Sequence, residues 1–186
     1  MKLYLLLLSF HLVSDSICQV DEEYVMNIDS PLYVCPDEES QAFVDATEIE
    51  VHRHNESTTY MTGVFKLLKT LDRKIVVEIL IAKETSGRHD LVTSIETCDF
   101  CEELKDPESI YGGCMKHFGF PEQCPVEARS YNVDNYVAET SQLPINSATV
   151  GRYQATINVY DDPSGLCNDD KIFLGCLKVD LVIEPM

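Results

Sequence analysis

Two segments near the C-terminus alternate between apolar and polar residues, and this pattern constrains the fold more than any other. The first segment directs four residues to one side: Tyr153, Ala155, Ile157 and Val159. The second directs five residues to one side: Phe173, Leu177, Val179, Leu181 and Ile183. A period of two is typical of strands with one buried face. The turn-forming run from Asp161 to Gly165 lies between them, so we expect a hairpin with a long, exposed loop and with Cys176 on the polar face of its second strand.

Most of the remaining chain also has strand-like patterns. They cover residues 22–28, 33–36, 49–55, 60–71, 73–83, 91–97 and 126–138. Segments 60–71 and 73–83 read as a pair of long strands joined at Asp72 and Arg73. Both faces of 73–83 are largely apolar, which favours a strand that is buried on both sides or that lines an apolar interior. The chain therefore predicts an all-β protein of about eight strands, an antiparallel β-sandwich or cup.

The exception is a cysteine-rich, weakly helical insert at residues 98–125. Asp106-Pro107 is a typical helix start, with an acidic N-cap followed by proline. Ile110, Cys114 and Phe118 recur at a spacing of four, which is helical, although Gly112-Gly113 weakens a helix there.

The N-terminus has the pattern of a secretory signal peptide. Lys2 precedes the apolar run from Leu3 to Val13, which is too short to span a membrane. Small residues follow, so cleavage is expected after Ser16 or after Cys18. With residues 1–18 removed, residues 19–186 form a single domain, secreted or in the lysosomal lumen.

The net charge of −18 restricts the partners. Cleavage after Cys18 removes one basic residue, Lys2, and one acidic residue, Asp15, so this charge is unchanged. A surface this acidic repels nucleic acid and anionic membranes. It serves solubility, or it suits an acidic compartment, where protonation of carboxylates weakens the self-repulsion.

The eight cysteines predict disulfides in a secreted chain. Cys98-x-x-Cys101 alone would also suit zinc or a redox pair, but no second ligand cluster and no βαβ context accompany it. Loss of Cys18 leaves an odd number, with one cysteine free or intermolecular. Retention of Cys18 allows four bridges, and spacing does not determine which cysteines pair.

No motif for catalysis or metal binding is found. The nucleophile elbow G-x-S-x-G and the zinc motif H-E-x-x-H are both missing. His52-x-His54 lacks a third ligand and is interpreted as a solvated strand face. We therefore expect no enzyme activity, no cofactor and no metal. Asn55-Glu56-Ser57 is a glycosylation sequon at the end of a predicted strand, so Asn55 should be exposed and glycosylated.

The second half of the chain resembles a known family. The run CDFCEELKDPESIYGGCMKHFGFPEQCPVEARSYNV is followed by GRYQATINVY and LGCLKVDLVIE. This order of motifs is similar to the GM2 ganglioside activator family of lipid-recognition (ML-type) proteins, and to related insect families that include chemosensory proteins. The resemblance covers about half the chain, from Cys98 to Glu184, with Cys35 as an outlying member.

The resemblance implies a β-cup whose sheets spread at one end to hold lipid tails, without catalytic residues. It also implies disulfides Cys35–Cys176 and Cys101–Cys124. The family's partner for Cys114 is missing, because glutamate and glutamine precede Cys124. The family has no cysteine at the hairpin-loop position of Cys167. The pairing of the remaining cysteines is therefore open.

Six residues are candidates for a lipid-lining wall: Phe65, Leu67, Ile79, Ile81, Phe118 and Phe120. For the four strand residues an ordinary core position is the favoured interpretation, whereas the two phenylalanines of the insert are expected near the surface and are the better candidates. The predicted function is a secreted, non-catalytic protein that binds, transfers or presents lipid. One alternative is a chemosensory carrier of hydrocarbons or pheromones. Another is an interaction module that acts on a receptor or hydrolase without lipid.

Overall fold

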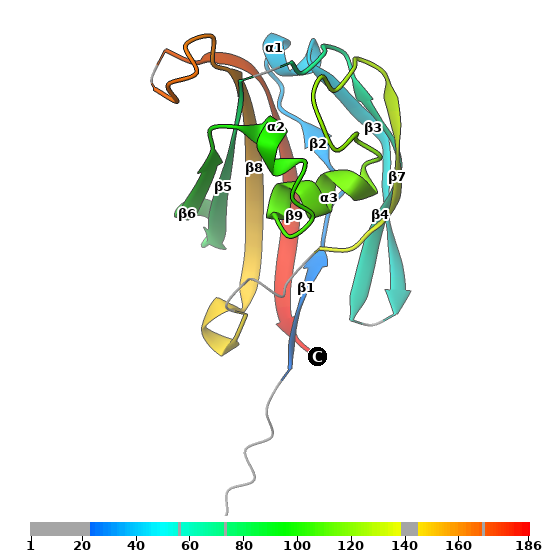
Figure 1. Ribbon diagram of the computed structural model, residues 1–186. Coiled ribbons are helices and arrows are strands. Elements are labelled where there is room, and N and C mark those ends of the chain that lie inside the picture. Colours follow the sequence, from blue (N-terminus) through cyan, green and yellow to red (C-terminus); the bar gives the residue numbers. More distant parts are fainter. Residues whose placement is uncertain (1–22, 56, 73, 139–144, 169) are drawn as a thin grey trace, which may run out of the picture.

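The computed structural model describes residues 23–55, 57–72, 74–138, 145–168 and 170–186. They form two antiparallel sheets that face each other as a sandwich (Figure 1). The first sheet has the order β1 (Tyr24–Ile28), β9 (Ile172–Pro185), β8 (Gly151–Asp161), β5 (Ile75–Thr85) and β6 (Arg88–Thr97), with β2 (Tyr33–Val34) also paired to β9. The second has the order β3 (Val44–Asn55), β4 (Thr58–Leu67) and β7 (Ser130–Tyr136). The predicted all-β sandwich with a small helical insert is confirmed.

The predicted C-terminal hairpin is the pair β8 and β9, which lies within the larger sheet. A bulge changes one of its predicted faces. Val159 is opposite Gly175, but Tyr160 is opposite Phe173, so Leu174 is an extra residue on β9. The bulge turns Phe173 to the outer face, where its ring lies 5.7 Å from that of Tyr160. The prediction that Phe173 shares the inner face of β9 is therefore wrong.

Strands β4 and β5 follow each other in the chain but belong to opposite sheets. The interpretation of 60–71 and 73–83 as one pair of strands is therefore wrong. After β4, Leu71 forms an isolated antiparallel β-bridge with Val126, which follows the insert. The two residues exchange backbone hydrogen bonds of 2.8 and 2.9 Å. It then enters β5, which is paired on both sides, by β6 and β8. Arg73 lies outside the described residues.

The insert folds into α2 (Phe100–Glu103) and α3 (Ile110–His117), which lie across the gap between the sheets (Figure 1). The N-cap of α3 is Ser109 and not Asp106, whose carboxylate instead accepts from the backbone N–H of Glu108 at 2.9 Å. Gly112 is required in α3, because a Cβ there would lie 2.1 Å from the Asp106 carbonyl oxygen. The glycines therefore do not interrupt this helix, and Gly112 lets it approach the preceding turn closely.

The two sheets are joined along one long side by hydrogen bonds between β1 and β4. Thr59 Oγ1 accepts from the Ile28 N–H at 2.7 Å, and Asn27 Oδ1 accepts from the Thr59 N–H at 3.0 Å. Both polar side chains are buried, Asn27 with 2% of its surface exposed. We call this set of contacts the β1–β4 seam.

Among the described residues three disulfides are formed, two of them those implied by the family resemblance: Cys35–Cys176 and Cys101–Cys124. The first binds the β2 segment and α1 (Glu38–Gln41) to the outer face of β9, where Cys176 was predicted. The third, Cys98–Cys167, joins the insert to the loop of the C-terminal hairpin. Cys114 is free.

The predicted signal peptide, residues 1–18, and its Cys18 lie outside the described residues. Among the helices that are described, none has the length and apolarity needed to span a membrane.

Candidate ligand-binding cavity

A cavity of about 410 Å³ lies between the two sheets and the insert. All six residues that the sequence analysis selected border it. Phe65 and Leu67 come from β4, Ile79 and Ile81 from β5, and Phe118 and Phe120 from the segment after α3. The structure thus brings together residues from both sheets and from the insert. Their contact with a lipid stays a prediction.

The insert aromatics lie deeper than the sequence predicts. Phe118 is 6% exposed, and its ring meets that of Phe65 edge-on at 5.7 Å. Phe120 is partly buried and lies 4.6 Å from the Tyr131 ring of β7. The expectation of two surface rings is therefore wrong for Phe118, because the chain after α3 turns back onto β4 and β7.

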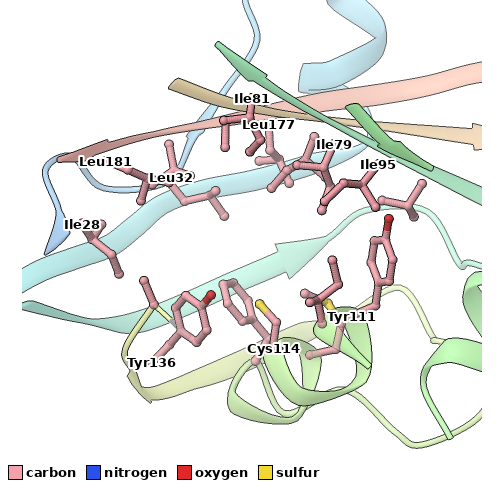
Figure 2. Close-up of a pocket in the computed structure, with 18 of the residues that line it drawn as sticks. Ile28, Leu32, Ile79, Ile81, Ile95, Tyr111, Cys114, Tyr136, Leu177 and Leu181 are labelled. Carbon is pink, nitrogen blue, oxygen red and sulfur yellow. The ribbon is translucent and has the colours of Figure 1, made fainter. Parts of the chain in front are cut away.

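Much of the cavity wall comes from elements that the sequence analysis did not assign to it. Ile28 and Leu32 line it near β1, and Leu177 and Leu181 line it from β9 (Figure 2). The signal for the β9 residues was present in the alternation of the C-terminal hairpin. That alternation indicates an inner face but does not show whether the face meets side chains or an open space.

The wall is free of charge. No Asp, Glu, Lys, Arg or His of the described residues borders the cavity. Most of its polar groups are weak or already bonded. Tyr153 Oη donates to the Thr149 carbonyl at 2.6 Å, and Thr149 Oγ1 donates to the Asn146 carbonyl at 2.8 Å. Burial raises the pKa of the Cys114 thiol to about 11, against a smaller lowering by a hydrogen bond with Tyr136. Cys114 is therefore a protonated, poorly nucleophilic wall residue.

The cavity reaches the surface between β6 and α3. Strand β6 is an edge of the larger sheet and is exposed along nearly its whole length. Val92 and Ile95 on β6 and Ile110 on α3 line the cavity and are also exposed, with 59% of the Val92 surface accessible. We call this gap the β6–α3 mouth. A ligand can reach the wall there without separation of the β1–β4 seam.

The histidine pair of β3 lies away from the cavity. His52 and His54 are not buried, and His52 Nε2 lies 3.4 Å from a carboxylate oxygen of Glu50. The one metal-ligand cluster found among the described residues contains Glu96, Cys98 and Cys167. Its two sulfur atoms are joined to each other, so they are not available as thiolate ligands.

The fold and the cavity together define a class of protein: an antiparallel β-sandwich that encloses an uncharged, apolar space open at one side. A scan of the sequence against protein-family models finds no match, and neither does a search among curated proteins. The similarity to the GM2 ganglioside activator family therefore stays a prediction.

Proposed function

We propose that this protein is a secreted, non-catalytic carrier that binds the hydrocarbon part of a lipid in the cavity, as proteins of the ganglioside activator type do. The uncharged wall of the 410 Å³ cavity is the observation that carries the proposal. A space of this size falls within the roughly 300–1,000 Å³ of small-molecule sites. Its wall offers almost nothing but apolar contact, so it favours a ligand that is itself largely hydrocarbon.

The hydrophobic effect is large enough for useful binding. Each methylene removed from water contributes roughly 0.8 kcal/mol, so a long acyl chain contributes on the order of 10 kcal/mol before costs. Association entropy and chain ordering offset several of these. Micromolar or tighter affinity follows from the tail alone, and the exposed part of the ligand would remain at the β6–α3 mouth.

Titration of delipidated protein with a fluorescent fatty acid or phospholipid tests the proposal. Uptake should saturate at a fixed ratio. Phe120→Asp places a charge in the cavity wall and should reduce the affinity at least tenfold, because a buried charge without a partner is costly. Phe173→Asp is the matched control, since Phe173 lies on the outer face of β9.

If no lipid class shows saturable uptake, either at pH 7 or at pH 5, the carrier function is refuted. A second candidate would then take its place, an interaction module for a receptor or hydrolase. The exposed apolar side chains of Leu91 and Val92 on the edge strand β6 favour that candidate. Native mass spectrometry of the purified protein separates the two, because a carrier should retain a lipid.

We also propose that the chain enters the secretory pathway, is glycosylated within it, and reaches the extracellular space or the lysosomal lumen. Its three disulfides suit an oxidising compartment. Asn55 is exposed at the end of β3, and its side-chain oxygen accepts from the Ser57 N–H at 2.9 Å. Protein from a eukaryotic secretory host should lose mass on treatment with an amide-cleaving glycosidase, and Asn55→Gln should abolish this loss. An unmodified Asn55 would contradict the assignment.

A further inference from the structure

Tyr111 places an unbonded hydroxyl in the cavity wall. The residue is 7% exposed, and its Oη is a buried side-chain atom without a hydrogen-bond partner. Tyr111 lines the cavity, and Figure 2 shows its hydroxyl directed from α3 toward Ile95 of the opposite sheet. A buried polar group left unpaired is costly, and such groups in native proteins are few. The hydroxyl is therefore a candidate donor to a ligand that enters the cavity. Because its oxygen has almost no accessible surface, the adjoining side chains of the wall must shift to admit the acceptor.

The side chain is held firmly in this orientation. Its ring lies edge-on to that of Phe100 at 6.3 Å. Its backbone N–H donates to Ser109 Oγ, the N-cap of α3, at 3.2 Å, and Ser109 Oγ donates in turn to Glu103. Packing and capping thus fix where the hydroxyl can make a hydrogen bond.

The surroundings of Tyr111 restrict the charge of that partner. Burial, together with smaller contributions from the Glu103 and Glu96 carboxylates, raises the pKa of Tyr111 to about 12. The phenol is therefore neutral and available as a donor. The Glu103 carboxylate repels an anion at this position, and Glu96 adds less because it is ion-paired with Lys171, so a neutral acceptor is favoured over a carboxylate or phosphate.

The size of the cavity restricts the hydrocarbon part. At about 30 Å³ for a water-sized group, 410 Å³ accommodates roughly 14 such groups, or about one hydrocarbon chain.

We propose that the cavity selects a single-chain neutral lipid whose oxygen, as in a long-chain alcohol or ester, accepts a hydrogen bond from Tyr111 Oη. This inference rests on the proposed carrier function and specifies its ligand class. Tyr111 is then the residue that determines specificity, and the apolar wall supplies the affinity. The oxygen lies beside α3, near the β6–α3 mouth, and the chain extends toward Leu181 and Ile28.

Three probes of equal chain length test the inference by displacement of a fluorescent lipid from wild-type protein and from Tyr111→Phe at pH 7. They are 1-tetradecanol, tetradecane and tetradecanoate. Wild type should bind the alcohol about tenfold more tightly than the alkane, the effect of one buried hydrogen bond. It should bind the carboxylate more weakly than the alcohol. Tyr111→Phe should lose the preference for the alcohol and retain binding of the alkane.

Two further measurements separate specificity from structural effects. Tyr111→Phe removes an unpaired buried hydroxyl, so the ligand-free variant should be at least as heat-stable as wild type. Tyr153→Phe is the matched control, because Tyr153 also lines the cavity but its hydroxyl is already bonded to Thr149. This control should keep the preference for the alcohol over the alkane.

The possible failures are distinguishable. If Tyr111→Phe keeps the alcohol preference, or if the carboxylate binds wild type most tightly, the inference is overturned while the carrier function stands. If none of the three probes displaces the fluorescent lipid and no lipid class shows saturable uptake, the proposed carrier function itself fails.

Discussion

The two long sides of the sandwich are built differently. At the β1–β4 seam, the buried side chains of Asn27 and Thr59 satisfy each other and the neighbouring backbone. At the β6–α3 mouth, an exposed strand edge faces a short helix, and apolar side chains such as Val92 and Ile110 are open to water. One side closes the sandwich with strand-to-strand contacts, and the other is spanned by the insert.

The difference assigns stability of the fold to the β1–β4 seam and entry of a ligand to the β6–α3 mouth. A side on which every buried polar group is paired has little to gain from a ligand. The mouth has exposed apolar surface and, behind it, the unpaired hydroxyl of Tyr111. A ligand that covers this surface and bonds to the hydroxyl would therefore lower the free energy of the protein. Disulfides compensate at the mouth, because Cys101–Cys124 joins the two ends of the insert to each other and Cys98–Cys167 joins the insert to the loop of the C-terminal hairpin. We expect perturbations of the seam to act on folding and perturbations of the mouth to act on binding as well.

The largest expected effect follows removal of the disulfide Cys35–Cys176, which lies on the closed side of the sandwich, the side of the β1–β4 seam. Cys35 and Cys176 are 141 residues apart, and closure of such a loop is worth about 5 kcal/mol in the chain-entropy model. The double variant Cys35→Ala/Cys176→Ala should lose about this much free energy of unfolding in urea titrations and should be secreted poorly.

The disulfide of the insert is the control for that experiment. Cys101 and Cys124 are 23 residues apart, so their replacement by alanine should cost only about 3 kcal/mol. A larger loss from the Cys101/Cys124 variant than from the Cys35/Cys176 variant would contradict the assignment of the closed side as the more strongly stabilised one.

Gly112→Ala should damage the mouth. Its Cβ would meet two backbone oxygens, of Asp106 at 2.1 Å and of Glu103 at 2.6 Å, so α3 must shift away from the turn after α2. We expect a loss of about 3 kcal/mol of unfolding free energy and weaker lipid uptake. Gly113→Ala is the matched control: its Cβ meets only the Pro107 carbonyl oxygen at 3.4 Å, and alanine should stabilise the helix by up to about 1 kcal/mol. Equal effects of the two variants would refute this account of α3.

Asn27→Ala should weaken the β1–β4 seam by about 2 kcal/mol, because it leaves the buried Thr59 N–H without its acceptor. Lipid affinity should change little, since the cavity is lined from other positions. Asn158→Ala is the control, because Asn158 binds Glu78 at a partly exposed position of β8 and should cost less than about 1 kcal/mol. If Asn27→Ala loses lipid uptake while its free energy of unfolding is unchanged, the separation of the two sides is contradicted.

The smallest effect concerns the loop that carries Cys167. The Asp162 carboxylate accepts from Ser164 Oγ, from the Cys167 N–H at 2.7 Å and from the Gly165 N–H, and these bonds lower its pKa. A lowered pKa stabilises the fold above the unfolded-state value and loses that effect as the pH falls through roughly 4 and below. Asp162→Asn should therefore lower the thermal midpoint at pH 7, and the gap to wild type should narrow toward pH 3.

Asp90→Asn on the exposed strand β6 is the control for that series, and its midpoint should follow wild type across the whole pH range. A constant gap between Asp162→Asn and wild type from pH 7 to pH 3 would show that the ionised carboxylate contributes nothing to the loop.

Local patterns determined the class of fold and the inner faces of its strands. The alternation from Tyr153 to Val159 needs only a period of two, a property of neighbouring residues in an extended chain. The apolar faces of the segment around Ile79 and Ile81 follow in the same way, and so does the helical spacing of Ile110 and Cys114. The disulfides Cys35–Cys176 and Cys101–Cys124 came from family resemblance and not from any local pattern.

Only the tertiary structure decided which strands lie opposite each other. It assigned β4 and β5 to different sheets, inserted Leu174 as a bulge and paired Cys98 with Cys167. It also left the Tyr111 hydroxyl unbonded in a cavity. These features depend on groups far apart in the chain, whose meeting is governed by the packing of two whole sheets. A period of two is the same whether an inner face meets side chains or an open space.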